Sequence, residues 1–177
     1  NRLKFNQPIL YYDLHADLAD YLSAKLLKAE AVIHYVASGN IVDAVQIAEQ
    51  AAHPLLVRGD HDAIMQMQNA LSDQFIPETN HAAAIVHIRA SRYADATTLL
   101  NLTESQLQNK VDKLPVVLSQ KAFIMLEQGE YQQALEVAQR VLEVGADQRI
   151  EAYAMRLCGV CHVYLDDIQN GIATLNQ

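Results

Sequence analysis

The stretch from residue 118 to 142 constrains the fold most strongly, because it spells two amphipathic helices joined at one glycine. Leu118 and Ala122 belong to an apolar face in its first half, and apolar residues recur at helical spacing in its second half. Gly129 can end the first helix in the left-handed conformation without steric cost. Ala122 and Ala134 are small and fall where the two helices would cross closest. Neither helix can bury its apolar face alone, so the hairpin requires neighbours of its own kind.

This hairpin resembles a tetratricopeptide repeat. The matching positions are Leu118, Ala122, Gly129, Tyr131, Ala134 and Ala138. A similar short signature recurs at residues 39–44, at 91–96 and, in degenerate form, at 166–171. The small residues at positions 44, 96, 134 and 171 are 52, 38 and 37 residues apart, whereas the usual period of the family is about 34 residues. The resemblance therefore implies a tetratricopeptide-like, right-handed α-solenoid of roughly ten helices in antiparallel pairs, with irregular repeats.

Composition favours an all-α fold. Hydrophobic residues make up 51% of the 177 residues, and only 6 Gly and 4 Pro are present to form loops. Helix-forming residues dominate, and long alternations of β-branched residues are absent. We expect a single helical-repeat domain over residues 1–177, with a lead-in and junction helix at 1–22, irregular as far as residue 9, and irregular repeats over 24–177. Because the chain begins at Asn1 and ends part-way along an expected helix, we interpret it as a fragment of a longer protein.

The charge distribution argues against nucleic-acid and membrane partners. The net charge is −8, from 13 basic and 21 acidic residues, and the basic residues form no run. Tight binding to phosphates depends on clustered Lys and Arg, so we expect no direct contact with nucleic acid or with an anionic membrane surface. No apolar run approaches the roughly 20 residues that span a bilayer. Two cysteines fit a reducing compartment, and we expect a cytoplasmic protein.

Local signals predict several helix ends. Asn40 is a plausible N-cap for a helix that Pro54 should stop or bend. Asp60 should cap the next helix, after a turn at Arg-Gly-Asp. A helix over residues 93–102 is expected to end there and to restart, through a hydroxyl-bearing residue, toward Asn109.

The order of these segments is similar to the start of the helical-repeat arm of large ATP-dependent LuxR-type transcriptional regulators, the relatives of the maltose-regulon activator. The matching features are Leu14-His15-x-x-Leu18, Gly39 with Asp43-Ala44, the turn at residues 58–60 and the hairpin at 77–96, within a resemblance covering about residues 12–140. The resemblance implies a non-catalytic sensor arm that binds an inducer or a regulatory protein. No Walker motif and no DNA-reading helix occurs here. The alternatives are a general tetratricopeptide scaffold with a peptide partner, unrelated to transcription, and an enzyme accessory domain.

One string, Cys158-Gly159-Val160-Cys161-His162, spells the C-x-x-C-H pattern of c-type haem attachment. It falls at the packing positions of an amphipathic helix, with Gly159 where a repeat favours a small residue. A redox pair would need a preceding strand, and a zinc site normally needs four ligands. We therefore interpret both cysteines as buried packing residues, and we expect no cofactor and no metal.

Nothing in the sequence predicts catalysis. The seven histidines include no His-x-x-x-His pair, and neither a nucleophile motif nor a glycine-rich phosphate loop is present. His61, between Asp60 and Asp62, could be half of a metal site, but a capped helix start explains it better. We expect that the protein is not an enzyme.

The resemblance to tetratricopeptide repeats also implies where a partner binds. In that family the first helix of each pair lines the concave face, which here would carry Glu78, His81, Arg89, Phe123, Glu127, Tyr153, Arg156 and Tyr164. Aromatic rings beside a guanidinium suit an inducer or peptide that bears a carboxylate, a phosphate or hydroxyl groups. The alternative is a solvated face without a ligand. Ile168, Ile172 and Leu175 would be left uncovered in the last helix, so self-association through the C-terminal end is also expected.

Overall fold

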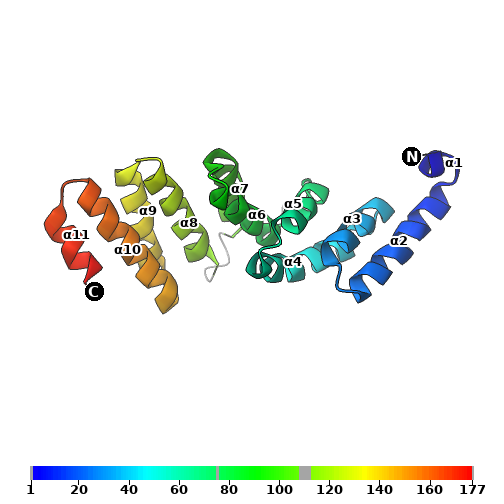
Figure 1. The fold of residues 1–177 in the computed structure, drawn as a ribbon, viewed down its shortest axis with the longest axis horizontal. Helices are drawn as coiled ribbons and strands as arrows, with labels where there is room; N and C mark the ends of the chain where they lie inside the picture. The colour runs from blue at the N-terminus through cyan, green and yellow to red at the C-terminus, as the bar shows by residue number, and fades with distance from the viewer. Residues whose placement is uncertain (1, 75, 108–112, 177) are drawn as a thin grey trace. The chain divides into compact units, whose positions relative to one another are not determined.

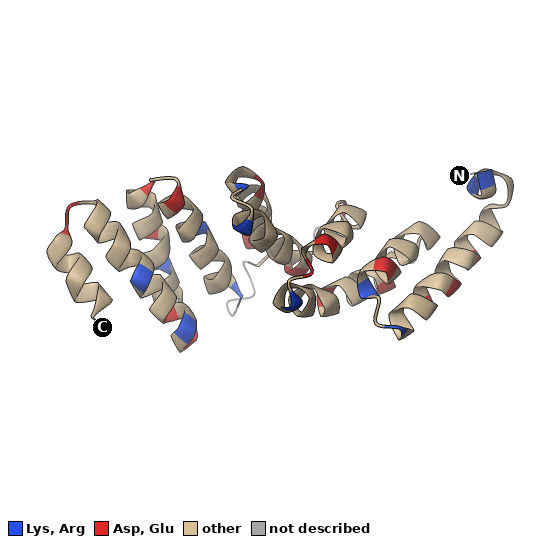
Figure 2. Ribbon diagram, in the orientation of Figure 1, with Lys and Arg blue, Asp and Glu red and all other residues tan. Residues whose placement is uncertain are grey.

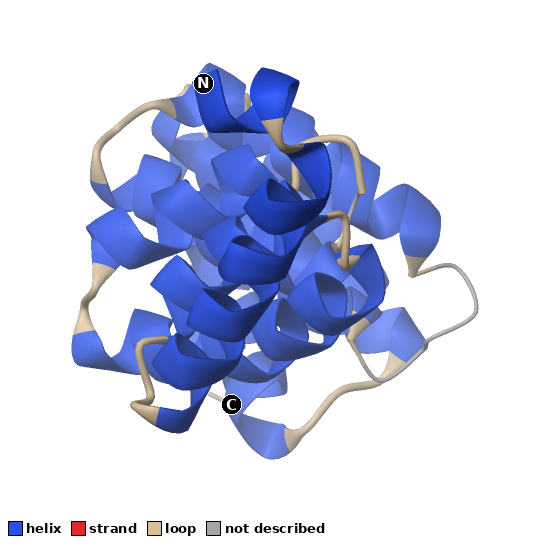
Figure 3. Cartoon of the chain, turned by 90° about the vertical axis from the view of Figure 1, so that its right-hand side faces the viewer, coloured by secondary structure: helices blue, strands red, loops and turns tan. Residues whose placement is uncertain are grey.

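A computed structural model describes residues 2–74, 76–107 and 113–176. Within these ranges the protein consists of eleven helices and contains no strand, which confirms the all-α prediction (Figures 1 and 3). The helices are α1 (Arg2–Asn6), α2 (Pro8–Ala24), α3 (Lys28–Ser38), α4 (Ile41–Arg58), α5 (His61–Ala70), α6 (Pro77–Arg89), α7 (Tyr93–Gln106), α8 (Leu114–Glu127), α9 (Tyr131–Val144), α10 (Gln148–Tyr164) and α11 (Ile168–Leu175). None of these described helices is long and apolar enough to cross a membrane.

The chain forms two compact units, residues 1–86 and residues 87–177. In the first unit, α3 packs against α2, α4 and α5. In the second unit, α8, α9 and α10 pack against one another, α7 packs against α8, and α11 packs against α10. The helices from α1 to α5 and from α7 to α11 are therefore each packed against the next helix in the chain, as in helical-repeat proteins. The expectation of one continuous repeat domain stays a prediction.

Small residues bring the helices of the first unit close together. The buried face of α4 carries four alanines and one leucine: Ala44, Ala48, Ala51, Ala52 and Leu55. A polar contact supplements this packing, because the Tyr35 hydroxyl on α3 donates a hydrogen bond of 2.7 Å to Asp20 Oδ1 on α2. This hydrogen bond, together with burial, raises the pKa of Tyr35 to about 12.

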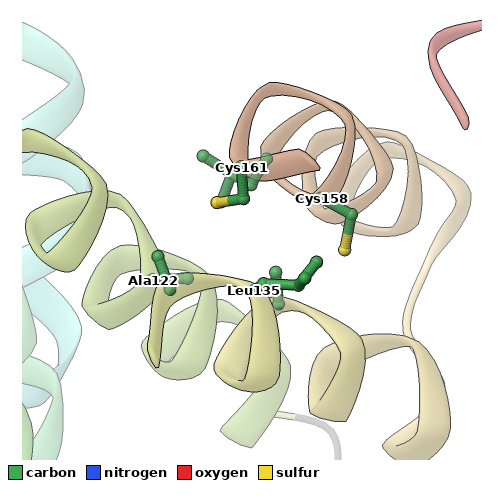
Figure 4. Close-up of a cluster of buried hydrophobic side chains, with 7 residues drawn as sticks. Ala122, Leu135, Cys158 and Cys161 are labelled. Carbon is green, nitrogen blue, oxygen red and sulfur yellow. The ribbon is translucent and has the colours of Figure 1, made fainter. Parts of the chain in front are cut away.

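The hairpin at residues 118–142 is present as predicted, in helices α8 and α9. Gly129 ends the turn with a φ of +80°, in the left-handed region. Ala122 and Ala134 are both fully buried in one apolar cluster. Figure 4 shows that Leu135 and the two cysteines of α10 belong to the same cluster. The repeat-like hairpin therefore buries its apolar faces against itself and against the next helix.

Helices α10 and α11 approach closely at a pair of glycines. A Cβ atom on Gly159 would lie 2.5 Å from Leu175 Cγ. A Cβ atom on Gly171 would lie 2.8 Å from Val163 Cγ2 and 3.1 Å from the Gly159 carbonyl oxygen. The prediction that position 159 requires a small residue is thus confirmed, and the partner is Gly171 on the facing helix.

Two helix boundaries differ from the sequence prediction, and Pro54, which was predicted to stop or bend its helix, does not stop it. Helix α4 continues through Pro54, because the turn that contains it buries Ala51, Ala52 and Leu55 and this burial offsets the lost backbone hydrogen bond. The lead-in is helical, since the Gln7 N–H donates to the Leu3 carbonyl.

Helix α7 does not break after residue 102. The hydroxyl of Thr103 donates to the Leu99 carbonyl, and the hydroxyl of Ser105 donates to the Leu102 carbonyl. Both side chains therefore satisfy carbonyls of their own helix instead of capping a new one. The expected continuation toward Asn109 lies outside the described residues.

The two predicted caps have different outcomes. Asp60 caps α5 as predicted, because its Oδ1 accepts a hydrogen bond of 3.3 Å from the Ala63 N–H, and Gly59 before it is left-handed with a φ of +74°. Asn40 precedes α4, but its side chain donates to the carboxylate of Asp43 and makes no capping bond to the backbone. The amide NH₂ of Asn40 is thus held by the carboxylate at the third helical position, and the amide oxygen, which would cap, bonds no backbone N–H.

Candidate functional site

The residues predicted to bind a partner are divided between the two units. Glu78 and His81 lie on α6 in the first unit, and Arg89, Phe123, Glu127, Tyr153, Arg156 and Tyr164 lie in the second. In the second unit the structure brings four of them together on α8 and α10. These four residues are Phe123, Glu127, Tyr153 and Arg156.

Arg156 and Tyr153 form the centre of this group. They are one turn apart on α10, and the Arg156 guanidinium carbon lies 5.0 Å from the centroid of the Tyr153 ring. A guanidinium at this distance is attracted by the face of the ring. Burial and the nearby Glu127 carboxylate raise the pKa of the Tyr153 phenol, while Arg156 acts in the opposite direction. The phenol is therefore a neutral hydrogen-bonding group beside an exposed cation.

The aromatic rings of the group are supported from the protein interior. Phe123 and Tyr153 are partly buried and pack against the cluster that contains Ala122, Leu157 and Cys161. Arg156, in contrast, is exposed on the same helix. The rings are thus held in place by the core, whereas the charged groups face the solvent.

Sequence reasoning missed one member of the group. The Tyr93 hydroxyl, at the start of α7, donates to Glu127 Oε2 over 3.4 Å. Tyr93 occupies the aromatic position of the signature at residues 91–96, so the sequence pattern marked it as a repeat residue and not as a surface ligand. We call Tyr93, Phe123, Glu127, Tyr153 and Arg156 the α8–α10 surface.

Tyr164 lies apart from Arg156. It lies eight residues further along α10, which is about 12 Å along the helix axis. Its ring stacks on Tyr131, with centroids 4.5 Å apart and an interplanar angle of 3°. The two tyrosines form a separate aromatic pair at the start of α9 and the end of α10.

His81 is far less accessible than a binding residue on an open face would be. Burial, together with the nearby His53, lowers the pKa of His81 to about 4, although Glu78 acts in the opposite direction. Among the described residues, its Nε2 atom has no hydrogen-bond partner. The imidazole is therefore neutral near pH 7 and offers no positive charge to an anionic ligand.

Both cysteines are buried free thiols on α10, within the cluster drawn in Figure 4. Burial and the neighbouring Cys161 raise the pKa of Cys158 to about 11, and burial raises the pKa of Cys161 as well. The thiols are protonated at neutral pH and are poor nucleophiles. Their predicted role as packing residues is confirmed.

The other charged groups of the second unit make structural contacts. Glu104 on α7 accepts from Lys121 on α8 over 2.6 Å and from Arg140 on α9 over 3.0 Å. Burial acts to raise the pKa of Glu104, but the two cations outweigh it and the pKa is lowered. Figure 2 shows Lys and Arg scattered singly along the helices. In the described part of the chain, no group of three or more His, Cys, Asp or Glu residues is arranged to hold a metal ion.

Comparison with known proteins adds no assignment. No protein-family model matches the chain, and a search of curated protein sequences gives no match. The resemblances to tetratricopeptide repeats and to the regulator arm therefore rest on the residues quoted for them.

Proposed function

We propose that this protein is a non-catalytic binding arm that takes an inducer or a regulatory protein on the α8–α10 surface. In this proposal the helices continue as a tetratricopeptide-like, right-handed solenoid of antiparallel pairs. The first helix of each pair, which includes α8 and α10, lines the concave face. The close α8–α9 hairpin, with its glycine turn and buried alanines, supports this arrangement.

The observation that carries the proposal is the exposed Arg156 guanidinium held over the Tyr153 ring, with the Glu127 carboxylate nearby. A guanidinium binds carboxylate or phosphate oxygens through two parallel hydrogen bonds, and the aromatic faces accept an apolar surface. A ligand with an anionic or hydroxylated group next to an apolar face fits both features. If this face were only hydrated and bound no ligand, the arrangement of Arg156, Tyr153 and Glu127 would have no role.

The parent protein, in this proposal, is a LuxR-type transcriptional regulator in the cytoplasm, and the arm senses its signal. The order of segments over residues 12–140 supports the regulator, and the two free thiols fit a reducing compartment. The alternative is a general tetratricopeptide scaffold that binds a peptide. The ligand class separates the two, because a sensor arm binds a small molecule or a specific regulator and a scaffold binds an extended chain.

The test begins with a thermal-shift screen of the full chain against carboxylates, phosphates and hydroxylated metabolites, followed by calorimetry on the compounds that bind. Arg156→Ala should weaken binding by about 1–3 kcal/mol, and Tyr153→Ala should also weaken it. Arg149→Ala is the matched control, because Arg149 is an exposed arginine on the same helix. Arg89→Ala tests whether Arg89, the other arginine that the sequence predicted to bind a partner, contributes to the affinity.

Equal affinity of wild type, Arg156→Ala and Tyr153→Ala for every binding compound would refute the α8–α10 surface as the site. A screen without small-molecule binders, combined with Arg156-dependent binding in a peptide array, would favour the scaffold alternative. In the intact regulator, loss of inducer response in Arg156→Ala but not in Arg149→Ala would support the sensor function.

A further inference from the structure

Two histidines from neighbouring helices of the first unit meet side by side. His15 on α2 and His34 on α3 place their Nδ1 atoms 2.6 Å apart. The ring centroids are 4.8 Å apart with an interplanar angle of 29°, so the two nitrogens lie almost on the line between the centroids and the rings meet edge to edge. Tyr11, one turn before His15, packs its ring 4.4 Å from the His15 ring. Both histidines are only partly buried, so solvent reaches the pair.

We propose that His15 and His34 form a two-imidazole site for a divalent transition-metal ion, with Cu²⁺ as the preferred ion. The site is independent of the α8–α10 surface and goes beyond the proposed binding function. Its protein ligands are the two Nδ1 atoms, and water completes the coordination.

Both rings must turn to bind one ion, because the two nitrogens now face each other. A metal–imidazole bond is about 2.0–2.1 Å long, so two nitrogens on one ion at 90–110° are about 2.9–3.4 Å apart. The present separation of 2.6 Å must therefore open by less than about 1 Å. Rotation of each ring about χ2 supplies this movement, because that torsion has a broad energy well in histidine. The ion would replace the single proton that the two nitrogens share.

The donor set decides which ion is expected. Imidazole nitrogens suit Cu²⁺, Ni²⁺ and Zn²⁺, and affinity in such sites is highest for Cu²⁺. Structural zinc normally takes four protein ligands, whereas tetragonal nitrogen and oxygen coordination with open positions is typical of Cu²⁺.

A bound ion would cross-link α2 to α3. These helices are joined by residues 25–27, where Leu26 has a φ of +63°, and they otherwise meet through the Tyr35–Asp20 hydrogen bond and apolar packing. Since a ligand that binds only the folded state stabilises it, Cu²⁺ should raise the melting temperature of this helix pair.

The experiment titrates the full chain, purified without metal, with CuCl₂ at pH 7.5 in a weakly coordinating buffer. Tyrosine fluorescence reports binding, because paramagnetic Cu²⁺ close to the Tyr11 ring quenches it and the chain contains no Trp. Electron paramagnetic resonance counts the coordinated nitrogens. The variants are His15→Gln, His34→Gln and, as the control, His61→Gln in the same unit. Circular dichroism at 222 nm verifies that each variant is folded.

We expect one tight site in the wild type, with two nitrogens in its spectrum, a raised melting temperature and quenched tyrosine emission. His15→Gln and His34→Gln should each lose at least about tenfold in affinity and should lose the thermal shift, while His61→Gln should match the wild type. Folded His15→Gln or His34→Gln protein that binds Cu²⁺ as tightly as the wild type would overturn the proposal. A spectrum without two nitrogen ligands at one equivalent would also overturn it.

Discussion

Replacing His81 by glutamine should remove a large part of the loss in the free energy of unfolding that the first unit undergoes at acidic pH. The pKa of His81 is about 4 in the folded protein, compared with its ordinary value of 6.5, because the ring is buried and lies near His53. In the unfolded chain the ordinary value applies. Between pH 6.5 and 4, therefore, the unfolded state binds a proton at this position that the folded state excludes.

The sign of the effect follows from this difference in proton binding. Because the pKa is lower in the folded state, the free energy of unfolding falls as the pH drops through this window, and the histidine has no effect on the pH dependence above about pH 7.5. A pKa difference of this size corresponds to a loss of about 3 kcal/mol by pH 4. The ring is mostly buried, so solvent screening reduces this figure little.

The assay is urea denaturation followed by circular dichroism at pH 7.5, 6.5, 5.5 and 4.5, for the wild type and for His81→Gln. Other titrating groups, including His87, are present in both proteins and cancel in the difference between their free energies of unfolding. This difference should shift by about 2–3 kcal/mol in favour of the variant between the highest and the lowest pH. His53→Gln should reduce the effect, because His53 contributes to the lowered pKa.

A difference between wild type and His81→Gln that is constant over the whole pH range would refute the reasoning. So would a titration of the His81 ring, followed by nuclear magnetic resonance, with a midpoint near 6.5. Either result would mean that the imidazole is hydrated in solution.

Three further predictions concern stability and association. Gly171→Ala should cost about 1–3 kcal/mol and should lower amide protection over residues 168–175 in hydrogen exchange, because the new methyl group meets Val163 and the Gly159 carbonyl; unchanged protection would contradict the close approach. Cys158→Ser and Cys161→Ser should each cost roughly 1–3 kcal/mol in urea denaturation, from burying a hydroxyl without a partner, and a reductant should not change the stability of the wild type. Ile172, which is 55% exposed, should support self-association, so Ile172→Glu should shift the sedimentation coefficient toward that of a monomer, and a wild type that is monomeric at all concentrations would rule this out.

Features that depend on neighbours in the sequence could be predicted. The turn at Gly129 needs only a left-handed residue between two amphipathic segments, and the buried faces of α8 and α9 follow from helical spacing. Asp60 as a cap and Gly159 as a close-packing residue are equally local. In each case the residue type and its place within one helix determine the outcome.

Features that depend on distant residues could not be predicted. Pro54 was expected to stop or bend α4 because an interior proline costs about 3 kcal/mol, but the helix continues, since tertiary burial of the surrounding alanines outweighed that local cost. Tyr93 and Glu127 are 34 residues apart, and His15 and His34 are 19 apart, so no motif spacing marks either pair. Tyr164 was grouped with Arg156 because both lie on a helix expected to line the concave face, while its stacking on Tyr131 depends on how α9 meets α10.

The contrast between Arg156 and His81 explains why the α8–α10 surface is the better candidate for recognition. The His81 ring is mostly buried and its lowered pKa leaves it neutral near pH 7, so an anionic ligand would find no positive charge there. Arg156 bears a guanidinium and is exposed, while the Tyr153 ring beneath it packs against the core. Immobilising a free arginine side chain costs up to about 2 kcal/mol of rotamer entropy, and stacking on a fixed ring restricts the side chain before a ligand arrives. The surface is therefore partly organised for binding in the free protein, and the rigidity of its aromatic support results from the same buried cluster that stabilises the repeat-like hairpin.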